Sequence, residues 1–310
     1  MKVVVTGAAG FVGGHVAEAL ARAGHAVLAV DAPARSLTPP RAEAAFAALG
    51  GVPGVVLRRL DLAEDTLEPL ADADAVVHLA GRPGVRTSWG AGRALVFRDN
   101  VEATRRLLEA CRENRPKVIV ASSSSVYGAA RRKPSRETDA LAPASPYAES
   151  KVEVERLAAK AAADGVGVAV LRYFSVYGPR QRPDMAFHRF IEAALDGRPL
   201  PLFGDGRQLR SFTHVRDVVA ATVAAVERDL PVGATVNVGG GEPVAVRDAI
   251  ALIADLAGVP ATVREQPPVA GDVPRTWADT GRAADLLGWR PTVPLGAGLA
   301  EQIAWHRSER

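Results

Sequence analysis

Short runs of β-branched residues alternate with longer amphipathic stretches along the first half of the chain. The runs are typical of strands, and the stretches between them have the apolar spacing of helices. Their alternation is typical of βαβ units and predicts an α/β fold with a doubly wound parallel sheet. Strands are predicted at 3–5, 26–30, 55–57, 75–79, 118–121 and 166–172, and helices at 11–22, 95–112 and 146–163.

The second half differs, because Gly- and Pro-rich loops separate its helices from about residue 176 onward. The length of 310 residues gives room for about two domains. We therefore expect a larger domain over 1–175, completed by about 212–243. A smaller C-terminal lobe is expected over 176–211 and 244–310.

A glycine-rich turn, TGAAGFVG at 6–13, directly follows the first predicted strand and opens a helix. Gly7 permits the tight turn, Gly10 lets a pyrophosphate approach the backbone, and Gly13 allows close packing of helix and strand. Asp31 ends the second strand, where a carboxylate can accept both ribose hydroxyls of NAD and would repel the 2′-phosphate of NADP. The turn predicts a Rossmann-like NAD site, with Arg35 as the feature that would suit NADP. The structural alternative is a solvated Asp31 that caps a turn.

Tyr147 and Lys151 stand four residues apart at a predicted helix start, so their side chains share one face. A free tyrosine has a pKa of about 10, and a nearby ammonium would stabilise its phenolate. Tyr147 could then accept a hydroxyl proton while hydride leaves the same carbon. Ser123, in a run of four serines after the strand at 118–121, would hydrogen-bond the reacting oxygen. The alternatives are a surface aromatic–aliphatic contact and a plain serine loop.

Composition narrows the classes of protein. Apolar residues at 48% and charged residues at 24% are typical of a soluble globular chain. A net charge of +3 is too small to indicate a protein that binds nucleic acids or membrane surfaces. No apolar stretch is long enough to span a membrane. The single cysteine, Cys111, indicates a cytoplasmic location. The six histidines lack metal-site spacing, so we expect no metal and place them on helix faces or in loops.

Several stretches together resemble the nucleotide-sugar epimerases and dehydratases of the extended short-chain dehydrogenase/reductase superfamily. They are TGAAGFVG, the serine run with VYG at 121–128, PYAESK at 146–151, RYFSVYGPRQRPDM at 172–185 and GDGRQLRSFTHVRDVV at 204–219. This resemblance spans nearly the whole chain. It implies a tightly held NAD, a UDP- or dTDP-sugar substrate, and commonly a homodimer formed through the helices near 95–112 and 147–163. It gives Ser123, Tyr147 and Lys151 the catalytic roles described above.

Departures from the related enzymes narrow the expected reaction. Ser124 and Ser125 stand where dehydratases of this group carry an Asp–Glu pair, and the Glu usual in UDP-glucuronate decarboxylases is likewise absent. Ser175 replaces the Asn usual in UDP-glucose 4-epimerases, and Val269 stands where these carry an Arg before the Gly-Asp pair. The stretch at 182–186 resembles the GRPDMA segment of UDP-glucuronate 4-epimerases.

We therefore expect an isomerase that converts UDP-glucuronate to UDP-galacturonate through a 4-keto intermediate. The first alternative is a UDP-glucose 4-epimerase, and a nucleotide-sugar dehydratase or decarboxylase comes after it. A redox sensor or scaffold that keeps the NAD fold is a non-enzymatic alternative, although such a protein would need no base.

The resemblance also implies the residues of the two sites. The cofactor site is expected to contain Gly7, Gly10, Phe11, Val12, Gly13, Asp31, Arg35, Asp61, Leu62, Leu79, Ala80, Gly81, Asn100, Tyr147, Lys151 and Tyr173. The substrate site is expected to contain Arg86, Ser123, Ser124, Tyr147, Ser175, Arg182, Arg210 and Arg275.

Particular roles follow for some of these side chains. Arg210 and Arg275 are expected to grip the diphosphate, because a guanidinium matches phosphate oxygens bidentately. Asn100 is expected to steady the serine loop. Most other arginines are expected on the solvated surface, among them Arg105, Arg106, Arg131 and Arg132.

Glucuronate poses a particular chemical problem. Oxidation at C4 places a ketone β to the carboxylate, and such acids lose CO2 readily when the breaking bond aligns with the carbonyl π system. Ser175 and Arg182 are the candidates to hold the carboxylate out of that alignment by geometric restraint. The structural alternative is a surface ion pair between Arg182 and Asp184.

Overall fold

The structure is a computed structural model that describes residues 1–67, 70, 72–129, 134–268 and 270–310. Arg131, Arg132 and Val269 lie outside these described residues, so the expectations for them stay predictions.

The centre of the molecule is a seven-stranded sheet in the order β11-β6-β5-β4-β1-β2-β3, with every pair parallel. The six strands predicted for the first half are all present, and a seventh, β11, joins beside β6. Because the strand order reverses between β1 and β4, the carboxyl edge opens a ligand crevice there. The strands are β1 (Lys2–Thr6), β2 (Ala26–Asp31), β3 (Val55–Arg59), β4 (Ala75–His78), β5 (Lys117–Ser123), β6 (Val168–Tyr173) and β11 (Ala234–Val238).

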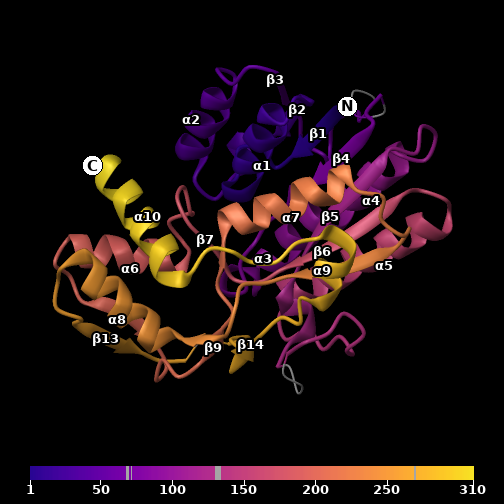
Figure 1. Ribbon diagram of the computed structural model, residues 1–310. Coiled ribbons are helices and arrows are strands. Elements are labelled where there is room, and N and C mark those ends of the chain that lie inside the picture. Colours follow the sequence, from indigo (N-terminus) through magenta and orange to yellow (C-terminus); the bar gives the residue numbers. More distant parts are fainter. Residues whose placement is uncertain (68–69, 71, 130–133, 269) are drawn as a thin grey trace.

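Helices cover both faces of this sheet, as Figure 1 shows. Alternate strand residues point to opposite faces, so Val3 and Val5 join one apolar core while Val4 joins the other. The first core packs against α1 (Phe11–Arg22), α2 (Pro39–Leu49), α7 (Val215–Glu227) and α9 (Gly281–Leu287). The second packs against α4 (Ala103–Ala110) and α5 (Pro146–Ala163). Burial on both faces explains why the inner strands β1, β4, β5 and β6 have nearly continuous apolar runs in the sequence.

The helix expected at 95–112 differs in detail from a regular α-helix. It consists of α3 (Gly92–Val96), a wider π-type segment η4 (Phe97–Glu102) and α4. Irregular turns of this kind occur often at functional sites. Here the wider turn carries Asp99 to the edge of a cleft and Asn100 to the loop after β4.

A smaller set of elements packs beside the carboxyl edge of the sheet, at the lower left of Figure 1. Its core contains Phe187, Ile191, Ile253 and Leu299. It consists of α6 (Ala186–Leu195), α8 (Val246–Ala257) and α10 (Leu295–Ser308), with β8 (Leu200–Phe203) paired to β13 (Val263–Gln266), β9 (Leu209–Arg210) between β12 (Val244–Ala245) and β14 (Arg275–Thr276), and β7 (Val176–Tyr177) paired to β10 (Thr213–His214).

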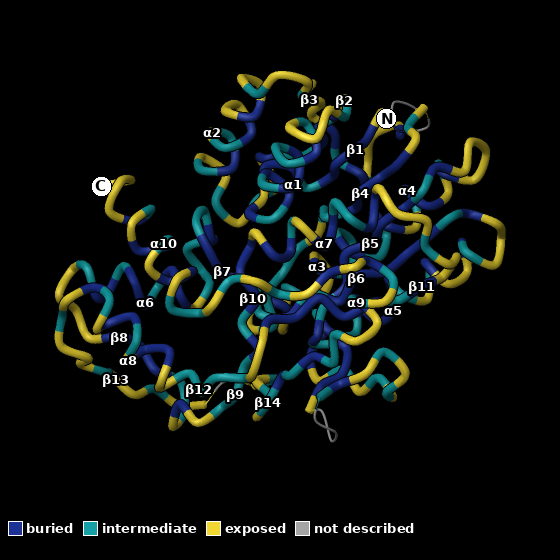
Figure 2. The backbone as a smooth tube through the Cα atoms, in the orientation of Figure 1, coloured by how far each residue is buried: buried dark blue, intermediate teal, exposed yellow. Residues whose placement is uncertain are grey.

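The remaining elements are short 3-10 turns, η1 (Pro33–Arg35), η3 (Arg86–Ser88) and η5 (Ser124–Tyr127). Figure 2 shows buried backbone along the central strands and exposed backbone mainly at the outer loops and helix ends. No helix among the described residues is long and apolar enough to cross a membrane.

Two histidines correct the expectation that all six lie on helix faces or in loops. His78 ends strand β4 and His214 ends strand β10, and both are buried. His78 bonds two threonine hydroxyls, 2.8 Å from Thr6 Oγ1 and 2.9 Å from Thr104 Oγ1. These partners satisfy both ring nitrogens and allow a polar side chain in a strand with a fully buried face.

Candidate active site

A cleft of about 390 Å³ lies over the glycine turn at the carboxyl edge of the sheet. Gly7 has a φ of +73°, and a Cβ there would lie 2.6 Å from the backbone nitrogen of Ala80. A Cβ on Gly13 would lie 2.0 Å from the carbonyl oxygen of Gly7. Only glycine fits at both positions, and no side chain caps the N-terminus of α1. The free N–H groups at that end can therefore receive a phosphate.

Asp31 lies on the wall of this cleft with both carboxylate oxygens engaged. One accepts a hydrogen bond from the N–H of Ala9 at 2.8 Å, and the other accepts from the N–H of Ala32 at 2.7 Å. Burial raises the pKa of Asp31, while the two backbone donors oppose that shift. The contact with Ala9 fixes the carboxylate against the glycine turn.

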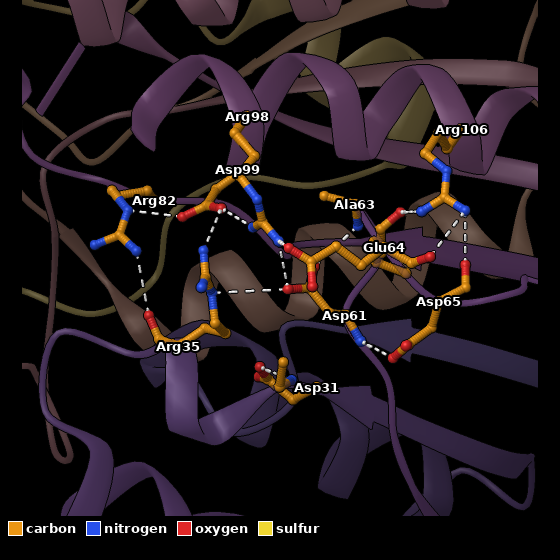
Figure 3. Close-up of polar contacts among 12 residues, drawn as sticks. Asp31, Arg35, Asp61, Ala63, Glu64, Asp65, Arg82, Arg98, Asp99 and Arg106 are labelled. Carbon is orange, nitrogen blue, oxygen red and sulfur yellow. Dashed lines mark hydrogen bonds and ion pairs between the residues drawn. The ribbon is translucent and has the colours of Figure 1, made fainter. Parts of the chain in front are cut away.

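Arginines and carboxylates form a network along one rim of the cleft (Figure 3). Arg98 bonds Asp61 at 2.7 Å and Asp99 at 2.6 Å, and Arg82 bonds Asp99 at 2.7 Å. Arg35 lies 3.7 Å from Asp61 and 4.0 Å from Asp99. Arg82 also donates to the backbone oxygen of Arg35 at 3.3 Å. The network joins the loops after β2, β3 and β4.

Fifteen of the sixteen residues expected at the cofactor line this cleft, and Asn100 does not. The Asn100 side chain is 1% exposed, and its Oδ1 accepts from the N–H of Arg82 at 2.6 Å. Its Nδ2 donates to Ser150 Oγ at 2.9 Å. Asn100 therefore ties the loop after β4 to α5. These hydrogen bonds do not reach the serine loop that Asn100 was expected to steady.

Sequence reasoning missed Arg82, Arg98 and Asp99 as lining residues. Arg98 and Asp99 are adjacent charged residues, a pattern that is equally typical of a solvated helix face. Arg82 has no such neighbour in the sequence. Arg106 was expected on the surface, yet it donates to the backbone oxygens of Leu62 at 2.8 Å and Asp65 at 2.7 Å. Arg105 is half-exposed, as expected, and forms an ion pair with Glu102.

The side chains of Ser123, Tyr147 and Lys151 line the inner end of the same cleft. Pro146 opens α5, and Ser145 caps it by accepting from the N–H of Ala148 at 3.2 Å. This cap sets Tyr147 in the first turn, with Lys151 one turn further. Ser123 follows at the end of β5, which lies beneath α5.

The protonation of this group follows from its surroundings. Burial raises the pKa of Tyr147, while a hydrogen bond with Ser123 and the charge of Arg182 oppose that shift. Burial lowers the pKa of Lys151 to about 8, and the nearby charge of Glu155 opposes that shift. Lys151 Nζ donates to the backbone oxygen of Ala121 at 2.8 Å. Lys151 lines the same cleft as Tyr147, one helix turn further along α5.

A buried polar network supports the serine loop from behind. Arg172 on β6 is 4% exposed and binds Glu155 with two hydrogen bonds, at 2.9 and 2.6 Å. Glu155 accepts from Ser122 Oγ at 2.5 Å. Arg172 also donates to Tyr127 Oη at 2.7 Å, and Tyr127 donates to Asn237 Oδ1 at 2.7 Å. The network fixes both ends of the segment that carries Ser123.

A second cleft of about 710 Å³ continues from the first toward the smaller set of elements. Both clefts are lined by Ser123, Tyr147, Ser175 and Arg182. The two clefts therefore meet at Tyr147, the candidate general base. The second cleft is also lined by Arg86, Arg189 and Arg210. Asp184 and Asp272 also line it and pair with Arg182 and Arg210, so the arginines exceed the carboxylates there and favour an anionic molecule.

The other residues expected at the substrate are only partly found in the second cleft. Arg86 and Ser124 line the second cleft, whereas Arg275 does not, so its role stays a prediction. Arg210 forms an ion pair with Asp272. Arg182 forms the ion pair with Asp184 that was the structural alternative, through two contacts of 3.0 Å, yet it also lines both clefts.

Sequence reasoning missed Arg189 and Phe203 in this cleft. The guanidinium of Arg86 lies 4.9 Å from the ring centroid of Phe203, and that of Arg189 lies 5.5 Å from it. Burial lowers the pKa of Arg189, and the charge of Arg86 adds to the effect. Two like charges held at one ring favour an anion between them.

Three potential metal ligands meet outside both clefts. They are His188 and Glu192 on α6 and His306 on α10, with ligand atoms within 4.8 Å of one another. His306 Nδ1 lies 2.6 Å from Glu192, Arg310 contacts Glu192 at 3.4 Å, and His188 Nδ1 bonds the backbone oxygen of Gln181 at 2.9 Å. The contact between His306 Nδ1 and Glu192 joins α10 to α6, and His306 Nε2 is buried without a hydrogen-bond partner.

Comparisons with known proteins agree with this geometry. An uncharacterized UDP-glucose epimerase, YtcB, of Bacillus subtilis is 39% identical over 98% of each chain. The structure of a UDP-glucuronic acid 4-epimerase from Bacillus cereus with UDP-glucuronic acid and NAD is 38% identical, covers 100% of both chains and has a TM-score of 0.96. The structure of MoeE5 with UDP-glucuronic acid and NAD is 40% identical over 100% of both chains with a TM-score of 0.91, and MoeE5 is also solved with UDP-glucose. The model of the NAD dependent epimerase/dehydratase family matches residues 3–239, and this chain belongs to that family.

Proposed function

We propose that the protein catalyses NAD-dependent epimerisation of UDP-glucuronate at C4, giving UDP-galacturonate. The observation that carries the proposal is the place of Arg182, which lines both clefts and lowers the pKa of Tyr147 by its charge. A cation for an acidic sugar therefore lies beside the base. Similarity to the Bacillus cereus enzyme over the whole chain supports the same substrate class.

The two clefts fit the two ligands of this reaction. The first would hold NAD, with the pyrophosphate at the uncapped start of α1 and a ribose at Asp31. Arg35, the feature that would suit NADP, already faces Asp61 and Asp99, whose charges would repel a further phosphate. The second cleft, between residues of 1–175 and those of 176–211 and 244–310, would hold the UDP-sugar.

NAD bound in the first cleft would supply the acceptor for a hydride from C4 and the donor that returns it. Tyr147 would accept the proton of the C4 hydroxyl and return it when the ketone is reduced. Lys151 would favour the phenolate by its positive charge. Ser123, which hydrogen-bonds Tyr147, would hold the C4 oxygen in line with that proton transfer.

The sugar must rotate between the two hydride transfers while its acidic group stays in place. Arg86, Arg189 and Arg210 offer cations for a diphosphate, and Arg182 with Ser175 offers a contact for the carboxylate. Ser175 has a φ of +34°, a left-handed conformation that non-glycine residues rarely adopt. Such local strain is typical of side chains held for function.

UDP-glucose is the second candidate substrate, and one observation favours it. Arg182 already has Asp184 as its partner through two hydrogen bonds, so a neutral sugar would not leave this charge unpaired. The similarity to MoeE5, which is solved with UDP-glucose and with UDP-glucuronic acid, is compatible with both substrates.

The purified protein should be incubated separately with UDP-glucuronate and UDP-glucose, and the C4 epimers resolved by chromatography. We expect faster conversion of UDP-glucuronate, and loss of about 10²-fold or more of kcat in Tyr147→Phe. Ser175→Ala and Arg182→Ala should lower the preference for UDP-glucuronate or release UDP-pentose. Equal activity of Tyr147→Phe, or conversion of UDP-glucose alone, would contradict the proposal.

We also propose a homodimer formed through the helices near 95–112 and 147–163, and a cytoplasmic location. Leu95 on α3 and Trp89 just before it are large apolar side chains that are 41% and 46% exposed. The thiol of Cys111 is buried, and burial raises its pKa to about 11, as suits a chain that uses no disulfide.

A further inference from the structure

The loop at 178–185 connects β7 to α6 and carries Arg182 into the junction of the two clefts. Two of its residues have left-handed backbone, Gly178 at a φ of +136° and Arg180 at +66°. A loop with such a backbone keeps its shape only where surrounding contacts determine it. Contacts that fix this loop therefore also fix Arg182.

Gln181 precedes Arg182 and has a side chain that is 3% exposed. Its Nε2 donates to the backbone oxygen of Val176 at 3.1 Å. Its Oε1 accepts from the N–H of His188 at 2.9 Å and from Gln302 Nε2 at 2.9 Å. All of these polar atoms are engaged, so the amide has one orientation.

Gln302 belongs to α10 and is completely buried. Its Oε1 accepts from the N–H of Gly178 at 3.0 Å, while its Nε2 donates to Gln181. Gln302 thus holds the loop at two points, at its first residue and beside Arg182. No described residue of α10 lines either cleft, so Gln302 itself touches neither ligand site.

The same loop is held from the cofactor side. Arg180 forms an ion pair with Glu18 on α1 at 2.6 Å, and His15 Nε2 lies 3.0 Å from the backbone oxygen of Pro179. These contacts fix the position of residues 179–180 against α1. The interaction with α10 then determines how the chain turns from there to Arg182.

We propose that Gln302 is a positioning residue that acts through Gln181 to hold Arg182 against the carboxylate of the sugar. This inference rests on the proposed function and adds that the C-terminal helix controls product fidelity. A loosened Arg182 would let the carboxylate of the 4-keto intermediate rotate into alignment with the ketone. The C5–C6 bond would then break, its electron pair would form the enolate, and CO2 would leave. A proton taken up at C5 would give a UDP-4-keto-pentose, and return of the hydride to C4 would convert it to UDP-pentose.

Gln302→Met removes both hydrogen bonds at nearly constant volume and tests the proposal. We expect about tenfold more UDP-pentose per UDP-galacturonate formed, because buried polar groups are left unpaired and the loop shifts. This ratio is independent of the folded fraction, since both products come from the same active enzyme. Ile303→Val, a buried apolar change on the same helix, is the matched control and should leave the ratio unchanged.

A double-mutant cycle with Arg182→Ala separates positioning from general damage. If Gln302 acts through Arg182, Gln302→Met should change neither the product ratio nor kcat/KM for UDP-glucuronate further in the Arg182→Ala background. Additive effects, or an unchanged ratio in Gln302→Met, would overturn the inference. If the unmodified protein forms no UDP-galacturonate, the proposed function fails instead.

Discussion

Lys151 is a buried cation without a carboxylate in direct contact among the described residues. Its ammonium donates to the backbone oxygen of Ala121, and its nearest acidic influence is Glu155, one turn further along α5. Glu155 is itself held by Arg172 and Ser122. One carboxylate therefore supports the serine loop and the charge of the proposed catalytic lysine together.

Glu155→Gln should shift the alkaline limb of the pH profile. Glu155 raises the pKa of Lys151, so its removal should bring that pKa below about 8. The phenolate of Tyr147 would then lose its ammonium at a lower pH. The measurement is kcat/KM for UDP-glucuronate against pH.

Glu153→Gln removes a half-exposed charge from the same helix and should leave the limb in place. Glu155→Asp keeps the charge and should restore most of the alkaline limb. An unshifted limb in folded Glu155→Gln would show that Lys151 is not held charged by this carboxylate.

At the scale of elements, local patterns predicted the sheet and its motifs well. The apolar runs predicted the inner strands β1, β4, β5 and β6 because burial on both faces leaves no polar alternation to interrupt them, whereas β3 at the sheet edge is partly exposed. The links that position the site were not predictable from sequence. Arg180 bonds Glu18, Gln181 bonds Gln302 and Arg172 bonds Glu155 across loops, and no spacing rule joins such positions.

The helices expected at the dimer surface offer a prediction of their own. Leu95→Asp places a charge on α3, where it should cost little in an isolated subunit because the side chain is already 41% exposed. In a dimer formed through these helices the same charge would be buried, so the subunits should separate. The mass measured by light scattering after gel filtration should fall to that of one chain.

Val56→Asp is the matched control, since Val56 is 65% exposed on the edge strand β3. This variant should keep the mass of the unmodified protein. A monomeric unmodified protein, or an unchanged mass for Leu95→Asp, would contradict the proposed dimer surface.

At the scale of the whole molecule, the buried histidines connect acidity with stability. Burial lowers the pKa of His78 to about 3, and the charge of Lys151 adds to that shift. His78 stays neutral in the folded state, whereas in the unfolded state it binds a proton below about pH 6.5. Folding is therefore more favourable at a pH above the ordinary histidine pKa. That contribution is lost as the pH falls from about 6.5 toward 3.

His78→Gln should flatten the acid dependence of the unfolding free energy. Glutamine can replace the hydrogen bonds to Thr6 and Thr104 and does not titrate. The loss between pH 7 and pH 5 should become smaller by about 2 kcal/mol. Urea unfolding at both pH values measures this loss, and His25→Gln, at a partly buried histidine that contacts Glu227, serves as the control. Equal losses with and without His78 would refute the assignment.

Strand β11 has a consequence for the order of folding during synthesis. It lies beside β6, yet residues 174–233 separate the two strands along the chain. Asn237 on β11 accepts from Tyr127, and Tyr127 accepts from Arg172, so the support behind the serine loop stays incomplete until β11 arrives. A ribosome-bound chain that ends before this strand would leave the buried hydroxyl of Tyr127 without the acceptor that Asn237 provides. The support behind the serine loop is therefore completed only after α6 has been made, although α8 and α10 still follow β11 along the chain.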